Sequence, residues 1–311
     1  TNKILISDSL DQVAVEIFTK NNIKVDVRTN LSPQELENII VNYKGLIVRS
    51  ATKVTKNVIK VANNLKIIGR AGAGVDNIDI NYAKANNIIV MNTPGGNTNA
   101  TAEHTFTLLL SLYRNITDAN DSTHKGLWEK KRFQGRELKG KKIGLIGFGN
   151  VASRVYQISK GFGMEVYTFS KSFEKRKKEY PDIKDVSLEE LITNCDIISF
   201  HCKANKNTNP IINKEEINKM KKNAVVINTA RGNLINEIDL KEALDKSSIL
   251  GAAIDVYLNE PAKKHILFGT KNVILTPHIA ASTIEAQSIV AKQIAEQVSD
   301  YLINGKIIND V

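Results

Sequence analysis

Short apolar runs alternate with longer amphipathic stretches from the N-terminus to about residue 90. The runs KILIS, KVDVR, GLIVR, KIIGR and IIVMN have the length and composition of buried parallel strands. Between two of them, SPQELENIIVNY has helical periodicity, and Pro33 follows Ser32 as it would at a capped helix start. The alternation predicts one doubly wound α/β unit.

A second set of apolar runs follows an apolar stretch from about Thr98 to Arg114, which we predict to be a long helix. These runs are KIGLIG, EVYTF, DIISF, AVVIN, GAAID and NVILT, again typical of buried parallel strands. Glu103 and His104 in the long helix are either a second acid/base pair or anchors of the helix, and we favour anchors. The pattern predicts a second α/β unit.

A glycine turn opens this second unit. In KKIGLIGFGNVASRV, an apolar strand leads to Gly147 and Gly149, and a helix is expected from Asn150. Gly147 would allow the tight turn, and Gly149 would let the backbone approach a pyrophosphate at the helix N-terminus. Ala152 stands where the third glycine of a dinucleotide fingerprint would be, and alanine is accepted there. The segment predicts a Rossmann nucleotide-binding domain.

The next strand, EVYTF, ends without the acidic residue that usually binds the ribose of NAD. Ser170 and Lys171 stand there instead, and a basic stretch follows at 175–178. A carboxylate would repel a 2′-phosphate, so its absence permits NADP, which cations would attract. NAD bound through Ser170 remains possible, with 175–178 as a solvated basic helix face. The expected cofactor is NAD or NADP.

Three ionisable residues, Arg231, Glu260 and His278, follow apolar runs in the last third of the chain. Each therefore lies where a buried strand should end, the usual place for a site in an open α/β sheet. Arg231 suits a carboxylate through two parallel hydrogen bonds, His278 suits proton transfer, and Glu260 would orient the imidazole and increase its basicity. We predict that these three catalyse hydride-transfer chemistry on a hydroxy acid.

Composition excludes some classes of protein but does not by itself indicate a function. The formal net charge of the 311-residue chain is +10, but basic residues do not alternate with aromatic ones, which argues against specific nucleic-acid recognition. The two cysteines, Cys195 and Cys202, bracket a predicted strand and would be too far apart to bridge, so reduced thiols are expected. No membrane span, signal peptide or metal-ligand spacing is apparent. A cytoplasmic protein with a small anionic substrate and no metal is expected.

Ordered motifs along nearly all of the chain carry a family resemblance. They include GLIVRSATKVT, IIGRAGAGVDNIDI, VMNTPGGNTNATAEHT, GLWEKKRF, the glycine turn, NTARG, GAAIDVYLNEP and LTPHIAAST. With them the chain resembles the D-2-hydroxyacid dehydrogenases. The resemblance implies a flavodoxin-like substrate domain at 1–97 and 284–311, reached again by the last helix, and a Rossmann domain at 98–283. It also implies catalytic roles for the same three residues, and a homodimer.

The family's binding residues carry over onto matching positions. The resemblance implies cofactor contacts from Gly147, Gly149, Asn150, Val151, Ser170, Lys171, Cys202, Thr229, Ala230, Asp255 and Ala280. It implies substrate contacts from Arg49, Arg70, Ala71, Gly72, Asn97 and Lys130. For Arg49 and Arg70 an ion pair that braces loops is the alternative. Lys130, with Lys131 and Arg132, is either a phosphate ligand, which in the family's dimer would reach a neighbouring subunit, or a solvated charge run.

Two segments depart from the family pattern besides Ser170. Ala73 replaces a common hydroxyl residue, and Cys202 and Lys203 stand where the strand DIISFH usually continues Thr-Pro. Lys203 is a second candidate partner for a 2′-phosphate.

Within the family, the branch that the chain most resembles oxidises 3-phosphoglycerate to 3-phosphohydroxypyruvate in serine synthesis. The alternatives are an NADPH-dependent glyoxylate or hydroxypyruvate reductase and a dinucleotide-sensing protein like the corepressors built on this fold. Many relatives in that branch continue into a regulatory domain, and the sequence leaves open whether one follows INGKIINDV.

Overall fold

The computed structural model describes residues 2–204 and 207–311, which form two compact α/β units. One unit comprises Thr1–Asn97 with Ala281–Val311, and the other comprises Thr98–Ala280. The predicted α/β class with two parallel sheets is confirmed.

The first unit contains a five-stranded parallel sheet in the order β2-β1-β3-β4-β5. This is the flavodoxin-like order, in which the chain reverses direction across the sheet between β1 and β3. The strands, which coincide with the five apolar runs, are β1 (Lys3–Ile6), β2 (Lys24–Val27), β3 (Gly45–Val48), β4 (Ile67–Arg70) and β5 (Ile89–Met91).

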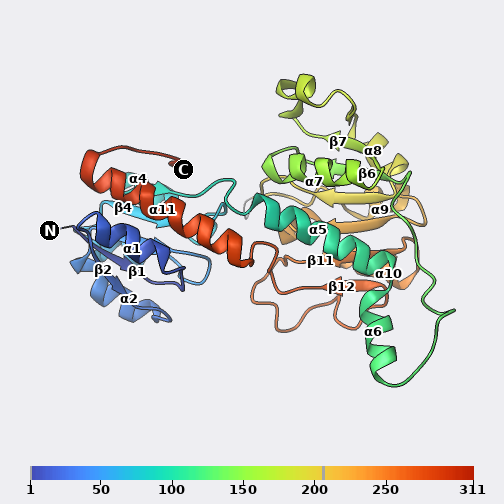
Figure 1. Cartoon of the computed structure of the whole chain (residues 1–311), viewed down its shortest axis with the longest axis horizontal. Coiled ribbons are helices and arrows are strands. Elements are labelled where there is room, and N and C mark those ends of the chain that lie inside the picture. Colours follow the sequence, from blue (N-terminus) through green and yellow to red (C-terminus); the bar gives the residue numbers. More distant parts are fainter. Residues whose placement is uncertain (1, 205–206) are drawn as a thin grey trace. The chain divides into compact units, whose positions relative to one another are not determined.

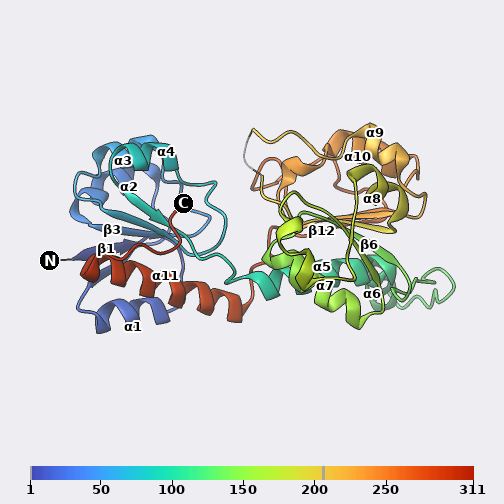
Figure 2. The same ribbon diagram turned by 90° about the horizontal axis from the view of Figure 1, so that it is seen from above.

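Helices cover both faces of this sheet (Figures 1 and 2). One face carries α1 (Val13–Lys20) and α11 (Ile284–Asn304), and the other carries α2 (Pro33–Ile39), η1 (Ile40–Asn42), α3 (Lys56–Val61) and α4 (Ile80–Ala85). Ser32 and Glu35 form a capping box at the start of α2, with Pro33 in its first turn as predicted. At Gly69 a Cβ would lie 2.9 Å from side-chain atoms of Ile294 and Val298, so α11 packs closely on β4.

The second unit contains a seven-stranded parallel sheet in the order β12-β11-β10-β9-β6-β7-β8. Its order reverses between β6 and β9, the point at which ligands bind in doubly wound sheets. The strands are β6 (Lys142–Ile146), β7 (Glu165–Phe169), β8 (Lys184–Asp185), β9 (Ile197–Phe200), β10 (Val225–Asn228), β11 (Gly251–Ile254) and β12 (Val273–Leu275). All six predicted runs are strands, whereas β8 was not predicted.

Helices α5 and α7 cover one face of this sheet, and α8, α9 and α10 cover the other (Figure 2). The helices of the unit are α5 (Thr98–Tyr113), α6 (Ile116–His124), α7 (Asn150–Gly161), η2 (Phe173–Lys175), η3 (Lys177–Glu179), α8 (Leu188–Asn194), α9 (Lys214–Lys219), η4 (Gly232–Leu234) and α10 (Glu237–Asp245). Cys195 and Cys202 are free thiols, as predicted. Within the described residues, no helix has the length and apolarity needed to cross a membrane.

Candidate active site

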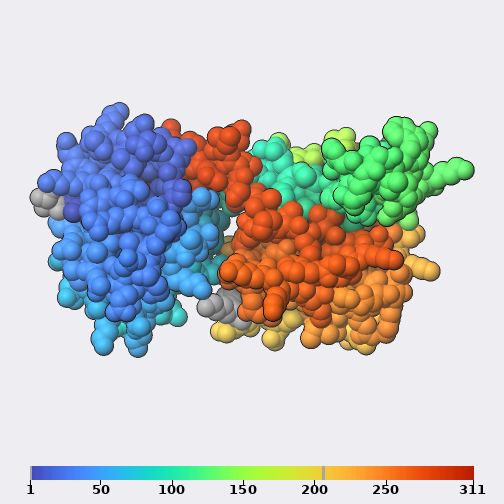
Figure 3. All heavy atoms as spheres, turned by 90° about the horizontal axis from the view of Figure 1, so that it is seen from below, coloured from blue at the N-terminus to red at the C-terminus, as the bar shows by residue number. Residues whose placement is uncertain are grey.

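The residues predicted to act in the second unit follow the carboxyl ends of its strands. Because all seven strands are parallel, these ends lie along one edge of the sheet. The segments after β6, β7, β9, β10, β11 and β12 carry, in that order, Gly147, Ser170, Cys202, Arg231, Glu260 and His278. The long segment after β11 lies on the surface of this unit, where its orange residues gather in Figure 3.

The glycine turn lies at the switch point of the sheet. Gly147 has a φ of +92°, and a Cβ there would lie 2.7 Å from the backbone N and Cα of Cys202, so both conformation and space require glycine. Gly149 is the N-cap of α7 and supplies no side chain to accept its first N–H groups. No atom lies within 4 Å of a Cβ built on Gly149. The protein itself therefore leaves room at the helix N-terminus for an anionic group.

A Gly149→Ala variant is expected to fold normally but to bind dinucleotide at least about tenfold more weakly, roughly 1.4 kcal/mol. The reason is that the added methyl meets nothing in the protein and would meet only the bound pyrophosphate. Isothermal titration with NAD and NADP, together with Tm, measures both effects. Gly161→Ala, another position with open space, is the control. Equal affinity in both variants would mean that no ligand approaches Gly149.

The adenosine end of the predicted cofactor site differs from expectation. Ser170 Oγ lies 3.1 Å from Ser172 Oγ, and Lys171 is exposed. The basic stretch at 175–178, for which a solvated helix face was the alternative interpretation, belongs to two short 3-10 turns. Arg176 stacks over Phe148 and Tyr180 and donates to the Tyr180 hydroxyl at 2.7 Å, so part of the predicted positive charge is engaged by the protein.

Glu260 and His278 form a direct pair. His278 Nδ1 lies 2.6 Å from Glu260 Oε2, and the side chains are 44% and 34% exposed. Because Nδ1 donates to the carboxylate, Nε2 is the ring nitrogen left to exchange a proton with a ligand. Burial raises the pKa of Glu260. This effect is smaller than the combined lowering by the hydrogen bonds from His278 and the Tyr257 N–H and by the positive charge of Arg231. The pKa of Glu260 is therefore below 4.5. The structure thus brings the three predicted catalytic residues together.

The lowered pKa of Glu260 predicts a pH-dependent contribution to stability. A depressed folded-state pKa stabilises the protein above the ordinary value of 4.5, and this stabilisation is lost as the pH falls through the folded-state pKa. We therefore expect Glu260→Gln to unfold at lower urea than the wild type at neutral pH, with the difference shrinking on the acid side of 4.5. Glu296→Gln, on the exposed side of α11, is the control. A difference that stays constant with pH would contradict the assignment.

Gly232 joins the Arg231 turn to the Glu260 loop. A Cβ at Gly232 would lie 2.0 Å from Tyr257 C and 2.4 Å from Leu258 N. Glu237, at the start of α10, accepts the Leu258 N–H through Oε1 at 3.2 Å, and its Oε2 lies 3.0 Å from His265 Nε2. These contacts keep Arg231 and Glu260 on adjacent backbones. Sequence reasoning missed them, although a glycine directly after a site arginine is a signal of close backbone approach.

Gly232→Ala is expected to lower the free energy of unfolding by about 1–3 kcal/mol, because the methyl would overlap backbone atoms that cannot rotate away. Turnover should fall as well, since the Glu260 loop must move off the Arg231 turn. Urea unfolding and initial rates measure the two effects, again with Gly161→Ala as the control. Wild-type stability and rate together would show that the two loops are not held by this contact.

Three residues predicted to contact the cofactor, Thr229, Ala280 and Asp255, make hydrogen-bond contacts within the protein. Thr229 is buried and its hydroxyl lies 3.1 Å from that of Thr105. The Ala280 N–H donates to Asp255 at 3.0 Å. Asp255 itself is fully buried, and both of its carboxylate oxygens accept hydrogen bonds from protein. The contact between the Asp255 side chain and the cofactor stays a prediction.

Three further histidines of this unit, His201, His265 and His124, lie outside the Glu260 and His278 pair. Burial lowers the pKa of His201 to about 3, so the ring is neutral and lies 2.9 Å from Ser199 Oγ. His265 packs against the rings of Tyr257 and Phe268. His124 is exposed near the end of α6.

In the first unit, Arg49 follows β3 beside the switch point of that sheet. Buried Asp8, after β1, accepts the Arg49 N–H at 2.6 Å. The Arg49 guanidinium makes no hydrogen bond or ion pair with the described residues, so the loop-bracing ion pair is not found. Gly72 has a φ of +141°, and Arg70 folds over it and donates to the Ala71 carbonyl at 3.1 Å.

Two N–H groups of the glycine-rich turn, those of the predicted substrate contacts Ala71 and Gly72, are bonded within the protein. The Ala71 N–H donates to the Val48 carbonyl at 2.9 Å, and the Gly72 N–H donates to Thr93 Oγ1 at 2.7 Å. Asn97, the last residue before α5, is half-buried.

Lys130 lies apart from the catalytic three. Its segment follows α6, beyond the C-terminal end of α5, and the nearby Arg136 donates to the Tyr113 carbonyl at 2.9 Å and to Asn223 at 3.5 Å. Asn223 precedes β10, so this segment lies toward the amino ends of the strands (Figure 1). The predicted Lys130 contact is therefore not made beside Arg231, Glu260 and His278 of the same chain. Lys130 and Lys131 are exposed, and Arg132 pairs with Glu129 at 2.8 Å.

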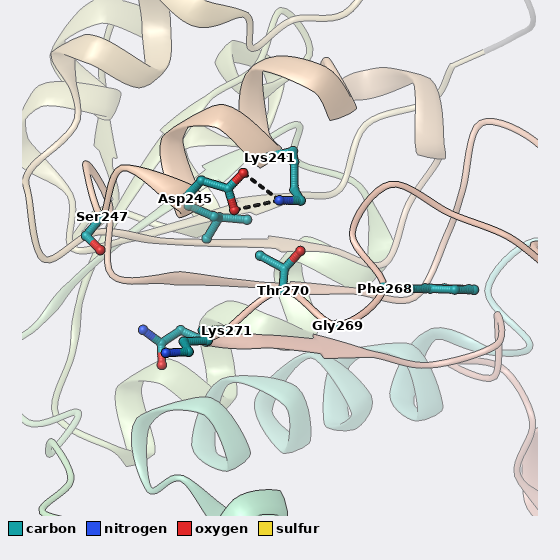
Figure 4. A pocket seen from close by; sticks show the side chains of 9 residues that line it. Lys241, Asp245, Ser247, Phe268, Gly269, Thr270 and Lys271 are labelled. Atoms are coloured by element: carbon teal, nitrogen blue, oxygen red, sulfur yellow. Dashed lines mark hydrogen bonds and ion pairs between the residues drawn. The ribbon is translucent and has the colours of Figure 1, made fainter.

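A pocket of about 430 Å³ also lies near the amino end of β12 (Figure 4). Its lining includes the ion pair of Lys241 with Asp245 and the Thr270 and Lys271 side chains. It lies near the amino end of β12, whereas Glu260 and His278 follow the carboxyl ends of β11 and β12. No cluster of three or more metal-ligating side chains occurs in residues 2–204 and 207–311.

A glycine turn at the switch point of a parallel sheet defines the second unit as a dinucleotide-binding domain. Residues 106–280 match the family model described as D-isomer specific 2-hydroxyacid dehydrogenase, NAD binding domain. The chain belongs to the D-2-hydroxyacid dehydrogenase family, as its motifs predicted.

Curated relatives and solved structures agree with this membership. The chain is 42% identical over 301 residues to D-3-phosphoglycerate dehydrogenase of Synechocystis sp., covering 97% of this chain and 54% of the relative. It is 42% identical over 297 residues to D-3-phosphoglycerate dehydrogenase of Archaeoglobus fulgidus, covering 95% and 56%. It thus spans little more than half of these relatives. An acyclic imino acid reductase solved with NADPH and D-Arg superposes with a TM-score of 0.89, at 32% identity and 99% coverage of both chains.

Proposed function

We propose that this chain oxidises a D-2-hydroxy acid with NAD or NADP, and that the acid is 3-phosphoglycerate, giving 3-phosphohydroxypyruvate for serine synthesis. The observation that carries the proposal is the Glu260 and His278 pair beside Arg231, on the same sheet edge as the glycine turn. The names of the curated relatives support the choice of substrate. Residues 1–97 with 284–311 would bind substrate, and residues 98–283 would bind the nucleotide.

Each of the three catalytic residues would have a separate role in the reaction. Arg231 would hold the substrate carboxylate through paired hydrogen bonds, which fixes C2. His278 Nε2 would remove the hydroxyl proton, while Glu260 stabilises the imidazolium that forms. The nicotinamide, when bound, accepts the hydride from C2. The space left at Gly149 and the first-turn N–H groups of α7 suit the pyrophosphate of that cofactor.

The second unit offers the features that a homodimer would use. Trp128 is 86% exposed and Leu127 is 48% exposed, on the same segment as Lys130. Large exposed apolar side chains of this kind mark interaction surfaces. In a homodimer, Lys130 would bind the phosphate of the substrate in the neighbouring subunit. We also propose that the enzyme acts in the cytoplasm. Light scattering of the wild type and of Trp128→Ser distinguishes dimer from monomer.

Initial rates with a panel of acids and both cofactors test the proposed reaction. 3-Phosphoglycerate with NAD and NADP is compared with hydroxypyruvate and glyoxylate and their reduced cofactors. Turnover of 3-phosphoglycerate supports the proposal. Selective reduction of glyoxylate or hydroxypyruvate with NADPH would favour the reductase, which the missing acid at Ser170 also suits. Dinucleotide binding without any turnover would favour the regulatory alternative.

A further inference from the structure

The turn at residues 49–52 of the first unit, the Arg49 turn, carries a half-buried guanidinium group that the protein itself does not bind. It makes no hydrogen bond or ion pair with the residues that the structure describes. The turn follows β3 directly, beside β1, where the strand order reverses and ligands bind in such sheets. A guanidinium placed there suits an anionic group. The proposed substrate carries a phosphate in addition to its carboxylate.

Asp8 holds the Arg49 turn from the side of β1. It is the second residue after that strand, and it is 7% exposed. Its Oδ2 accepts the Arg49 N–H at 2.6 Å, and its Oδ1 accepts the Thr52 N–H at 3.0 Å and the Thr52 hydroxyl at 2.6 Å. One buried carboxylate therefore binds the N–H groups at both ends of the turn.

Asn77 holds the same turn from the segment after β4. Its Nδ2 donates to the Arg49 carbonyl at 2.7 Å and to the Thr52 carbonyl at 2.6 Å. Its own carbonyl accepts the Val54 N–H at 2.8 Å, which joins the two segments just beyond the turn. Arg49 and Thr52 are thus held by their N–H groups on one side and by their carbonyls on the other. A network satisfied in this way is rigid.

We propose that Asp8 and Asn77 are positioning residues that fix the Arg49 turn, so that the guanidinium meets an anionic group of the substrate. The proposal rests on the proposed function, in which that group is the phosphate of 3-phosphoglycerate. Asp8 and Asn77 do not touch the substrate in this account. They act by lowering the entropy that is lost when the long Arg49 side chain is ordered by a ligand, because its backbone is already fixed.

Asp8→Asn separates positioning from the charge of the carboxylate. Removal of a negative charge beside the Arg49 turn would by itself favour an anion. The amide has only one oxygen, however, so its NH₂ group would face either the Arg49 or the Thr52 N–H, and the turn would loosen. Positioning therefore predicts weaker binding of a phosphorylated acid, whereas charge alone predicts tighter binding. Asn77→Ala loosens the other side of the turn without a change of charge.

Saturation kinetics with 3-phosphohydroxypyruvate and hydroxypyruvate test the proposal, because these two acids differ only by the phosphate. In Asp8→Asn and in Asn77→Ala we expect the KM for 3-phosphohydroxypyruvate to rise roughly five- to tenfold or more. The KM for hydroxypyruvate should change by less than about twofold. A general loss of structure would not separate the two acids in this way.

Asp26→Asn and Asn86→Ala are the matched controls, since they make the same changes elsewhere in the first unit. Asp26 lies within β2 and pairs with Lys3 at 2.8 Å. Asn86 follows α4 and donates to the Tyr82 carbonyl at 2.8 Å. Both variants should keep the wild-type KM for each acid.

A double-mutant cycle with Arg49→Ala tests whether Asp8 and Asn77 act through the arginine. Arg49→Ala should itself raise the KM for 3-phosphohydroxypyruvate, and adding Asp8→Asn or Asn77→Ala should then raise it by less than about twofold more. Thr52→Val is the milder variant if Asp8→Asn does not fold, because it removes only the hydroxyl that Asp8 accepts. It should raise the same KM by a smaller factor than Asn77→Ala.

Three kinetic outcomes would overturn the proposal. These are a lower KM for 3-phosphohydroxypyruvate in Asp8→Asn, equal rises in KM for the two acids, and full additivity with Arg49→Ala. Failure of the proposed function would be recognised separately, as a wild type that does not reduce 3-phosphohydroxypyruvate.

Amide hydrogen exchange needs no turnover and tests the turn itself. The Arg49 and Thr52 amides should exchange about tenfold faster in Asp8→Asn than in the wild type, and as in the wild type in Asp26→Asn. Unchanged exchange in Asp8→Asn would show that Asp8 does not hold the turn, and this too would overturn the proposal.

Discussion

Replacement of His278 by glutamine is expected to lower kcat by about two to four orders of magnitude, the usual contribution of general acid–base catalysis. Glutamine can still donate to Glu260, so the loop geometry is kept, but it cannot exchange the substrate proton. The Kd of the dinucleotide should stay within about twofold of the wild type, because the glycine turn and α7 are untouched. Stopped-flow rates and calorimetric titration measure the two quantities.

His124→Gln is the matched control, since it makes the same change at an exposed histidine of the same unit. It should leave kcat unchanged. Near-normal turnover in His278→Gln would remove the histidine from the mechanism, and loss of dinucleotide affinity along with activity would point to a folding defect instead.

Arg231→Lys is expected to lower kcat/KM roughly ten- to hundredfold, about 1.5–3 kcal/mol. Lysine keeps the positive charge, but an ammonium group cannot make the paired hydrogen bonds that a planar guanidinium offers to a carboxylate. KM for the acid should therefore rise, with a further loss in kcat where C2 is misaligned. Saturation kinetics with each acid of the panel separate the two effects.

Arg136→Lys provides the control, because Arg136 bonds Asn223 before the amino end of β10 and faces no proposed ligand. It should behave as the wild type. An unchanged KM in Arg231→Lys would mean that the substrate carboxylate is held elsewhere, for instance by the glycine-rich turn of the first unit.

The strands were predictable because buried parallel strands are apolar on both faces, which gives unbroken runs such as AVVIN and GAAID. β8 was missed because it has only two residues, Lys184 and Asp185, and both are exposed. For the basic stretch at 175–178 the sequence left open a cofactor contact or a solvated helix face, and the structure has two short 3-10 turns there. There, Arg176 stacks on Phe148 and Tyr180, and sequence periodicity does not reveal such contacts.

Residue chemistry at strand ends was enough to select Arg231, Glu260 and His278, since each suits one step of the reaction. It did not reveal the surroundings of Asp255, which the family pattern assigns to the cofactor. Its bonds to Thr276, Ile279 and Ala280 form only when β11 and β12 are paired in register. The position of Lys130 depends on the path of the chain after α6. No local pattern shows that this segment turns toward the amino ends of the strands.

Deuterium transfer tests the central claim, that Arg231, Glu260 and His278 carry out hydride transfer between nicotinamide and a 2-hydroxy acid. The wild type would be incubated with NADH and NADPH deuterated at nicotinamide C4, and with 3-phosphohydroxypyruvate, hydroxypyruvate and glyoxylate. We predict that mass spectrometry finds deuterium at C2 of the hydroxy acid formed, and that the His278→Gln variant transfers almost none. If the wild type binds the dinucleotide but labels none of these acids, the account is contradicted.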